Sequence, residues 1–432
     1  MREMKNSGIE WIGEIPKEWK ITEIKHYCID VFAGGTPQST NFYYWGGDIK
    51  WIPSGSCHDC KIYSAPKTIT KMGYENSSTK LIPANTALVA MTGATCGNTG
   101  FLTFESCANQ SVTAYVANTK IADSLFLWYL LQSAKEHLLT FQTGGAQGGI
   151  NVENCKNIVV PFVPISDQQK LSAYLDNKCT KIDSIIEKQE KIIEKLKAYK
   201  LSVITEAVTK GLNPDVKMKD SGVEWIGEIP EHWKCVPIKA YTDILPGYAF
   251  SSQDFSTEKG IPMLRGVNVT PKGIRWDETV YWNKELSDNL KTFVLHKGDV
   301  VMGLDRPWVS EGTRITFIEQ DNLLLVQRVC KISTNKNMDK RWVYHWLDGE
   351  AFKQSVSIET TGVSVPHIST KQIGNFIISY PPLEEQYQIA DYLDKKCSAI
   401  DKSIEQKQAI IEKLKEYKKS LIYEVVTGKR EV

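Results

Sequence analysis

Arginine and tryptophan side chains occur together, beside turn-forming residues, in the second half of this 432-residue chain. The members of this set are Arg265, Lys272, Arg275, Trp276, Trp282, Arg306, Trp308, Arg314 and Arg328. A planar guanidinium group can donate two parallel hydrogen bonds to a guanine edge or to a phosphate group. The set therefore predicts a surface within residues 234–380 that contacts DNA.

Polar uncharged side chains take the place of these arginines within residues 20–160. The candidates there are Thr36, Gln38, Ser39, Thr40, Asn41, Thr92, Asn98 and Gln110. Amide side chains pair well with the edge of adenine, and hydroxyl groups bind phosphate oxygens. We therefore predict a second DNA-contacting surface that is chemically unlike the first.

The segment Cys57-His58-Asp59-Cys60 is the strongest candidate for a metal site. It supplies two thiolates, whereas a closed zinc site needs four ligands. His26, Cys96 and Cys107 could complete such a site only if the fold brought them next to it. An enzyme with a zinc or cysteine site assembled by folding stays open as an alternative, but we predict that no metal is bound.

Motifs typical of catalysis are absent from the sequence. It contains no phosphate-binding loop of the form G-x-x-x-x-G-K-[ST] and no Asn-Pro-Pro or Asp-Pro-Pro followed by an aromatic residue, the pattern of base methylation. Cys179 and Cys397 recur at matching helical positions, as do Asp183 and Asp401, so packing or surface exposure explains them better than chemistry. We predict a binding protein that has no catalytic residues and binds no cofactor itself.

The composition is that of a globular protein rather than a disordered or polycationic one. The chain has 52 Lys and Arg against 51 Asp and Glu, a net charge of +1, and is 42% hydrophobic. This balance excludes a disordered chain and a histone-like protein. Because no apolar run approaches the length of a membrane span and no signal-peptide pattern is present, we expect a cytoplasmic protein without membrane contacts.

Two segments that flank the candidate surfaces are duplicated. Gly8–Trp19 recurs as Gly222–Trp233, with the shared pattern G-[IV]-E-W-I-G-E-I-P-x-x-W. A second repeat begins at Gln168 and Gln386 and ends at Thr209 and Thr427. The chain is therefore predicted to consist of two tandem halves, whose repeated frame holds two different inserts.

The second repeat predicts two long helices, over residues 167–209 and 385–427. Ser166 and Gln169 form a capping-box pattern at the first start, and Gly211 marks the first end. At 1.5 Å per residue each helix is roughly 60 Å long and needs a partner for its apolar stripe. We expect the two helices to pack antiparallel as a coiled coil, with a coiled coil between two chains as the alternative. The predicted contact residues are Ile182, Ile185, Ile192, Leu196, Tyr199, Ile400, Ile404, Ile411, Leu414 and Tyr417.

The two inserts are predicted to be α+β modules with functional loops. Short apolar runs predict strands, and longer ones predict helices. The predicted strands are 86–91, 157–161, 299–302, 314–318 and 376–378, and the predicted helices are 124–140 and 340–355. The predicted domains are residues 1–165 with the repeat motif 4–19, a central helix 166–211, residues 212–383 with the motif 218–233, and a C-terminal helix 384–432.

The whole arrangement resembles the specificity (S) subunit of type I restriction-modification systems. The repeated Gly8–Trp19 motif and the repeated helix beginning at Gln168 carry this resemblance. Gly34-Gly35-Thr36-Pro37, followed by Tyr44-Trp45-Gly46-Gly47, resembles the opening of a target-recognition domain. Pro381–Gln386 resembles the family's entry into the helix, whereas the first copy departs from that pattern as Val163-Pro164-Ile165-Ser166-Asp167-Gln168.

The resemblance implies an α+β fold with two target-recognition domains joined by two long helices in an antiparallel coiled coil, a pseudo-twofold tandem repeat. Each domain would read one half of a split, asymmetric target in double-stranded DNA, and the helix pair would set the spacer. Two methylation (M) subunits that bind S-adenosylmethionine, and restriction (R) subunits that use ATP and Mg²⁺, would assemble around this non-catalytic subunit. The complex would be a DNA adenine methyltransferase and endonuclease. A coiled-coil scaffold with two modules that do not bind DNA is the other alternative.

Overall fold

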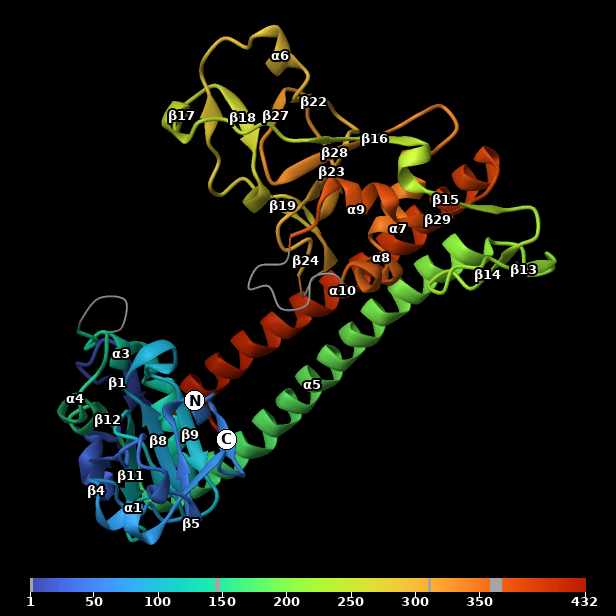
Figure 1. Cartoon of the computed structure of the whole chain (residues 1–432). Helices are drawn as coiled ribbons and strands as arrows, with labels where there is room; N and C mark the ends of the chain where they lie inside the picture. Colours follow the sequence, from blue (N-terminus) through green and yellow to red (C-terminus); the bar gives the residue numbers. More distant parts are fainter. Residues whose placement is uncertain (1–2, 144–147, 310–311, 358–366) are drawn as a thin grey trace. The chain divides into compact units, whose positions relative to one another are not determined.

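The computed structural model describes all residues except 1–2, 144–147, 310–311 and 358–366 (Figure 1). The chain forms two compact units, one made of residues 1–190 with 408–432 and the other of residues 191–407. Both long helices, α5 (Ile165–Lys210) and α10 (Leu383–Val426), contribute a segment to each unit. Among the described residues, no helix is both long and apolar enough to span a membrane.

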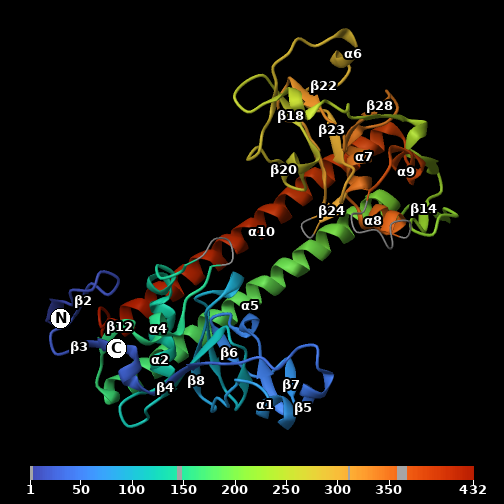
Figure 2. The ribbon, with the colours of Figure 1, turned by 60° about the vertical axis from the view of Figure 1, so that its left-hand side comes forward.

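The first unit is built on a five-stranded sheet of order β4-β11-β8-β9-β6, with a three-stranded sheet β10-β5-β7 beside it (Figure 2). Two two-stranded pairs, β1 with β2 and β3 with β12, complete its strands. The strands are β1 (Met4–Asn6), β2 (Glu14–Pro16), β3 (Lys20–Glu23), β4 (Cys28–Ala33), β5 (Trp45–Ile52), β6 (Cys60–Ile62), β7 (Lys67–Ile69), β8 (Thr86–Ala90), β9 (Thr99–Leu102), β10 (Cys107–Ala108), β11 (Val112–Ala117) and β12 (Val159–Phe162). The short helices are α1 (Lys71–Glu75), α2 (Ser124–Ser133), α3 (Lys135–Leu139) and α4 (Val152–Lys156).

Helix α2 covers the sheet and carries the centre of the first core. Asp123 caps it by accepting a hydrogen bond from the N–H of Phe126 at 2.8 Å, which satisfies one of the free donors of the first turn. Phe126, Leu130 and Leu131 are almost completely buried against the sheet. The helix forms where the sequence predicts it, packed against β8 and β9, while Tyr129 on it donates to Asp176 of α5.

The second unit contains a four-stranded sheet of order β16-β28-β23-β26 and a group of order β17-β21-β18-β27-β22. The strands are β13 (Met218–Asp220), β14 (Glu228–Pro230), β15 (Lys234–Pro237), β16 (Thr242–Pro246), β17 (Phe255–Ser256), β18 (Ile261–Leu264), β19 (Val269–Thr270), β20 (Gly273–Ile274), β21 (Tyr281–Trp282), β22 (Val294–Leu295), β23 (Val300–Gly303), β24 (Trp308–Val309), β25 (Gly312–Thr313), β26 (Ile315–Phe317), β27 (Leu323–Leu325), β28 (Val329–Thr334) and β29 (Ile377–Tyr380). The short helices are α6 (Asp288–Lys291), α7 (Lys340–Leu347), α8 (Glu350–Ser357) and α9 (Thr370–Asn375). The strands predicted for the two inserts are found close to their expected positions, whereas each predicted helix is divided into two, α2 with α3 and α7 with α8.

The duplicated Trp motifs fold into the same substructure in each unit. Lys5 pairs with Ile15 in the β1–β2 hairpin, and Lys219 pairs with Ile229 in the β13–β14 hairpin. The Trp11 indole donates to the carbonyl of Val159 at 3.2 Å, and the Trp225 indole donates to the carbonyl of Ile377 at 3.1 Å. The prediction of a tandem repeat with an α+β module in each half is confirmed.

The buried stripe of the long helices is repeated in both copies. It begins with spacings of four, three and four residues and continues at intervals of seven and ten, along residues 175, 179, 182, 186, 193 and 203 of α5 and residues 393, 397, 400, 404, 411 and 421 of α10. The predicted contacts Ile182, Ile400, Ile404 and Ile411 are buried, and Leu196 and Leu414 are half-buried.

Four predicted contacts of the helix pair are wrong. Ile185, Ile192, Tyr199 and Tyr417 are 37–50% exposed. The second line of contacts runs one residue further along, through Ile186 and Ile193, because the spacing of four residues that begins at Leu175 and Cys179 sets the phase of the stripe. The heptad was therefore recognised, but one of its two positions was misassigned.

A lysine–aspartate pair joins the two helices within each unit. In the first unit, Lys418 Nζ lies 2.7 Å from Asp183 Oδ1, and in the second unit Lys200 Nζ lies 2.7 Å from Asp401 Oδ2. In both pairs a residue late in one helix meets a residue early in the other. The helix segments therefore pack antiparallel within each unit, as predicted.

The predicted capping box of α5 is wrong. The helix begins at Ile165, before Ser166, and the N–H groups of Asp167 and Gln168 donate to the carbonyl of Pro164 at 3.0 Å. The preceding proline therefore starts the helix, and Ser166 lies inside its first turn instead of capping it.

The repeated glutamines Gln168 and Gln386 attach each long helix to its module. Gln168 accepts from the N–H of Asp123 at 2.9 Å and donates to the carbonyl of Val163 at 2.7 Å. Gln386 accepts from the N–H of Asp339 at 2.9 Å and donates to the carbonyl of Pro381 at 2.9 Å. Both side chains are completely buried, so each repeat uses the same amide to fix the N-terminus of α2 or α7 against the long helix.

Candidate nucleic-acid interface

Corresponding positions in the two units can be assigned from matching backbone hydrogen bonds. Met91 N–H donates to the carbonyl of Ser111 at 2.7 Å, and Leu304 N–H donates to that of Arg328 at 2.8 Å. Ala90 N–H donates to the backbone carbonyl of Asn98, and Gly303 N–H donates to that of Arg314, both at 2.8 Å. In the first unit, the loop after β8 and the turn before β11 form one surface. In the second unit, the loop after β23 and the turn before β28 form the matching surface. We call each of them the strand-end surface of its unit.

Three candidate residues find counterparts on this surface. Asn98 corresponds to Arg314, and the turn Gln110–Ser111 corresponds to Gln327–Arg328. Counting forward from Met91 and Leu304, Gly93 corresponds to Arg306. The same backbone thus presents small or uncharged side chains in the first unit and arginines in the second.

The strand-end surface of the second unit is organised around Asp305. The Asp305 carboxylate lies 2.7 Å from His367 Nδ1 and 3.4 Å from Arg328 Nη1. Its backbone carbonyl accepts a hydrogen bond from Arg314 Nη1 at 2.7 Å. Sequence reasoning named the arginines but missed Asp305 and His367, because neither has a local motif and their contact joins residues 62 positions apart.

Two of these arginines have an unusual backbone conformation. Arg306 has φ +44° and Arg328 has φ +70°, a region that side chains other than glycine rarely adopt. The counterpart of Arg306 in the first unit is Gly93, with φ +70°. A strained non-glycine conformation is retained where its side chain is useful, and two such arginines on one surface indicate a functional site.

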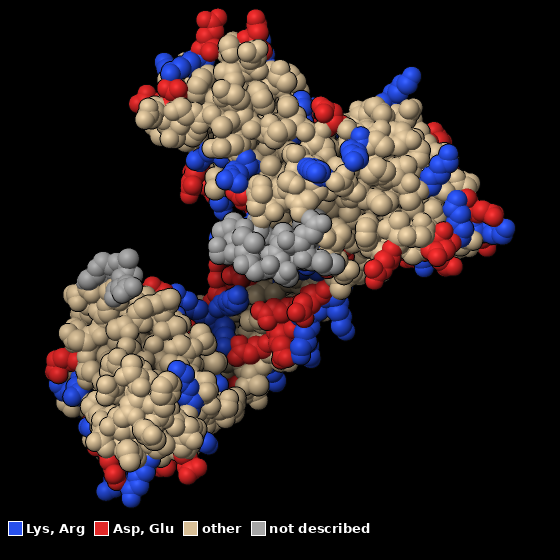
Figure 3. Space-filling view, viewed as in Figure 1, with Lys and Arg blue, Asp and Glu red and all other residues tan. Residues whose placement is uncertain are grey.

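Arg265, Arg275 and Lys272 extend this basic surface. The Arg265 guanidinium donates to the carbonyl of Glu278, and a Cβ built at the next residue, Gly266, would lie 3.5 Å from the Arg328 Cβ atom. Arg275 and Lys272 are exposed. Lys and Arg side chains are visible among uncharged surface on the face of this unit in Figure 3. The candidate Trp308 differs from them, because it is half-buried and packs against the core.

The strand-end surface of the first unit brings Thr36, Thr92 and Gln110 to one end of the sheet. Thr36 donates a hydrogen bond from its hydroxyl to the Gln110 amide oxygen, and all three side chains are exposed. A Cβ at Gly34 would lie 2.1 Å from the carbonyl oxygen of Ala108, so glycine is required for this close approach. A Cβ at Gly247 would meet the carbonyl of Val326 at the same distance in the second unit.

Asn98 is engaged within the fold. Its amide oxygen accepts from Lys135 Nζ at 2.7 Å, and its amide nitrogen donates to the carbonyl of Cys57 at 3.2 Å. Asn98 therefore supports the loop from inside, which makes it a weaker candidate for DNA contact than Thr92 or Gln110.

The remaining candidates of the first unit lie on a separate segment, in which Gln38, Ser39 and Thr40 are exposed and Asn41 is half-buried. They precede β5, whose eight residues span roughly 23 Å and end beside Asn109. The next residues, Phe42 and Tyr43, are 87% and 81% exposed. Sequence reasoning missed these two aromatic residues, although a three-residue aromatic run in a tight turn cannot be buried on every side.

The Cys57–Cys60 segment acts as a structural turn. Asp59 accepts from the N–H of Thr99 at 2.7 Å and pairs with Lys135 Nζ at 2.9 Å. Burial raises the pKa of the Cys57 thiol to about 12. Over the described part of the chain, no group of three or more His, Cys, Asp or Glu side chains is placed to hold a metal ion.

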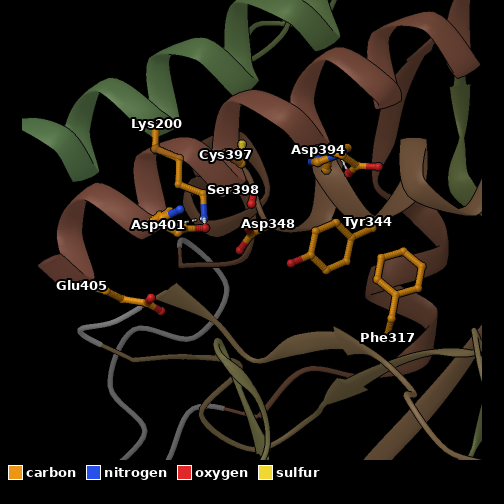
Figure 4. A pocket seen from close by; sticks show the side chains of 11 residues that line it. Lys200, Phe317, Tyr344, Asp348, Asp394, Cys397, Ser398, Asp401 and Glu405 are labelled. Atoms are coloured by element: carbon orange, nitrogen blue, oxygen red, sulfur yellow. Dashed lines mark hydrogen bonds and ion pairs between the residues drawn. The ribbon is translucent and has the colours of Figure 1, made fainter.

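A pocket of about 570 Å³ lies between α7, α5 and α10 in the second unit (Figure 4). Lys200 reaches Asp401 across it, while Tyr344 projects into it from α7 and Asp348 from the position just after α7. Burial raises the pKa of Asp348 to about 6, and burial also raises the pKa of the Cys397 thiol to about 11. Cys397 is therefore protonated near neutral pH and poorly suited to act as a nucleophile.

The corresponding place in the first unit has different side chains. His345 Nε2 contacts Asp394 at 3.0 Å in the pocket, whereas Tyr129 donates to Asp176 at 3.3 Å in the first unit. Asp348, nine residues after the α7 cap, corresponds to Gln132, nine residues after the α2 cap. These groups connect module and helix, and the strand-end surfaces remain the better candidates for ligand contact.

The comparisons with known proteins agree with this reading of the structure. The family model described as type I restriction modification DNA specificity domain matches residues 16–200 and 230–416. The chain belongs to this family, which confirms the resemblance seen in the sequence. It therefore has two DNA specificity domains, and the scaffold and hidden-enzyme alternatives gain no support.

Individual relatives show the extent of the similarity. The MjaVIII specificity subunit of Methanocaldococcus jannaschii is 29% identical over 353 residues, covering 81% of this chain and 80% of that protein. The putative MjaX specificity subunit of the same organism is 26% identical over 449 residues, covering 97% and 95%. A chain from a structural study of complex assembly and conformational transition of the type I R-M system shares the fold, with a TM-score of 0.69 at 15% identity over 95% of this chain and 98% of that one.

Proposed function

We propose that the strand-end surface of each unit reads one half of a split DNA target, and that α5 and α10 set the unread spacer. The observation that carries this proposal is the correspondence of the two surfaces: one backbone arrangement presents Gly93, Asn98 and Ser111 in the first unit and Arg306, Arg314 and Arg328 in the second. Because the two sets of side chains differ in charge and hydrogen-bonding groups, the two half-sites differ, and the target is asymmetric.

The chain supplies recognition, and partner subunits supply the chemistry. In the proposed complex, two methylation subunits bind S-adenosylmethionine, and restriction subunits use ATP and Mg²⁺. The family match and the lack of a catalytic motif in the sequence support this division. The assembled complex would methylate adenine in double-stranded DNA and cleave unmodified DNA.

The test is to express the chain with its methylation subunits and to map methylated adenines across a genome. We expect one motif with two unlike halves separated by a gap of fixed length. A continuous or palindromic motif would contradict the two-surface reading. In DNA binding, no preference for any duplex over bulk DNA at moderate salt would refute sequence recognition by the complex.

A domain exchange tests the assignment of the halves. Replacing residues 20–160 with the corresponding segment of a relative should change one half of the methylated motif and leave the other half unchanged. Replacing residues 234–380 should change only the other half. A change in both halves after either exchange would show that the units do not read independently.

A further inference from the structure

Arg314 differs from the exposed residues Arg275, Arg306 and Arg328 in how firmly its guanidinium group is held. Nε donates to the carbonyl of Val269 at 2.9 Å, and Nη1 donates to the carbonyl of Asp305 at 2.7 Å. Both acceptors are backbone atoms, so neither can swing away. Three of its five N–H groups have no acceptor within the described part of the chain.

The charge of Arg314 is poorly compensated within the unit. Its side chain is half-buried, and no carboxylate of the described residues lies within 4 Å of its nitrogen atoms. Burial lowers its pKa, and the positive charges of Arg306 and Arg275 lower it further, against the opposing effect of Asp305. A fixed, partly desolvated cation of this kind gains most from an external group that offers two acceptors.

The neighbouring arginines are held more loosely. Arg306 and Arg328 are exposed, and the Arg328 contact with Asp305 is long, at 3.4 Å. Arg275 is also exposed and lies 3.6 Å from Asp277. Long exposed side chains suit phosphate groups, which tolerate a range of positions, whereas reading a base edge requires a fixed one.

We propose that Arg314 reads a guanine in the half-site of the second unit, by donating two hydrogen bonds to its O6 and N7 atoms, and that Arg306 contacts a phosphate. This assignment rests on the proposed function, because it requires that the strand-end surface faces DNA. The sequence alone makes every arginine of the set an equal candidate for DNA contact, whereas this assignment gives Arg314 and Arg306 different roles.

The experiment uses the full chain assembled with its methylation subunits and duplexes that carry the methylated motif. 7-Deazaguanine, which lacks N7, replaces one guanine at a time. Wild-type complex should lose affinity at one guanine of the second half-site, where 7-deazaguanine removes one of the two hydrogen bonds. R314Q removes both, so it should lose roughly 5- to 150-fold on unmodified DNA and show no further loss when that guanine is replaced.

R306Q is the matched control. It should bind more weakly to all sequences alike and should keep the wild-type sensitivity to each 7-deazaguanine. The slope of log affinity against log salt should fall by about 1. R314M keeps much of the length of the side chain but removes every donor, so it should behave like R314Q in the 7-deazaguanine series.

Several outcomes overturn the assignment. If R314Q and R314M stay as sensitive as wild type to every substituted guanine, Arg314 only braces the loop. A half-site of the second unit without a G·C pair would also refute the assignment. As a folding control, both variants should unfold at the same temperature as wild type, which excludes misfolding as the cause of a lost affinity. Failure of the proposed function is distinguishable, since wild-type complex would then prefer no duplex at all.

Discussion

The two units use one backbone arrangement to present two kinds of chemistry. The first unit exposes Thr36, Thr92 and Gln110 at the ends of its central strands, and the second exposes Arg306 and Arg328 at the corresponding place. Matching backbone hydrogen bonds position these loops in both units, and side-chain contacts such as that of Arg314 with Asp305 add to them. A duplicated frame can therefore change its surface chemistry without rebuilding its core.

The contacts that attach each long helix to its module, unlike the strand-end surfaces, use the same side chains in both units. Gln168 and Gln386 make the same contacts in both units, and the pairs Lys418–Asp183 and Lys200–Asp401 recur with them. These residues are identical in the two halves because their partners belong to the repeated frame. The comparison thus separates residues that build the repeated frame from residues that differ between the two strand-end surfaces.

The largest effect is expected from removing the repeated glutamines. Gln168→Ala should lower the free energy of unfolding by about 3 kcal/mol, since it leaves the buried N–H of Asp123 and the carbonyl of Val163 without partners. Gln386→Ala should cost a similar amount in the second unit. Denaturant unfolding measures the loss, and hydrogen exchange should show faster opening of α2 in the first variant and of α7 in the second.

Gln169→Ala is the control for this pair. Gln169 is exposed, so its replacement should change stability by less than about 0.5 kcal/mol. Two results would contradict the prediction. One is a change in the free energy of unfolding of Gln168→Ala as small as that of the control, and the other is hydrogen exchange that speeds up in α7 as much as in α2. Either would show that Gln168 does not fix α2 locally.

A smaller, pH-dependent effect is expected at Asp348, which corresponds to Gln132. Its pKa is raised by burial to about 6, above the ordinary value of 3.8, so its folded form binds a proton that the unfolded form releases between these values. Its contribution to stability therefore falls as pH rises from about 4 to 6 and stays unfavourable above that range. Asp348→Asn should raise the free energy of unfolding by about 2 kcal/mol at pH 8.

The pH series contains its own control. Near pH 4 both wild type and Asp348→Asn carry a neutral side chain, and their unfolding temperatures should nearly coincide. Gln132→Asn, at the matching place of the first unit, should give a stability difference from wild type that does not change with pH. An equal difference for Asp348→Asn at pH 4 and pH 8 would show that packing, not charge, controls this position.

The frame was predictable from the sequence, whereas the site was predictable only in part. Duplication, caps and apolar periodicity are local patterns, so the modules and helices could be placed from them. The phase of the helix stripe was missed at Ile185 and Ile192, because two neighbouring isoleucines fit the heptad equally well until the partner helix is known. The arginines were named, but the hub formed by Asp305 and His367 arises only from the fold.

The smallest effect is expected at Arg306, and it would sharpen the comparison of the two surfaces. Arg306→Gly places in the second unit the residue type that Gly93 supplies in the first, and φ +44° suits glycine. Relief of strain should raise the free energy of unfolding by about 1 kcal/mol, while DNA affinity falls because one positive charge is lost. Gly93→Ala should instead destabilise the first unit by a similar amount. Thermal unfolding and DNA binding of the assembled complex measure both properties, and a variant that lost stability together with affinity would show that Arg306 serves the fold rather than the ligand.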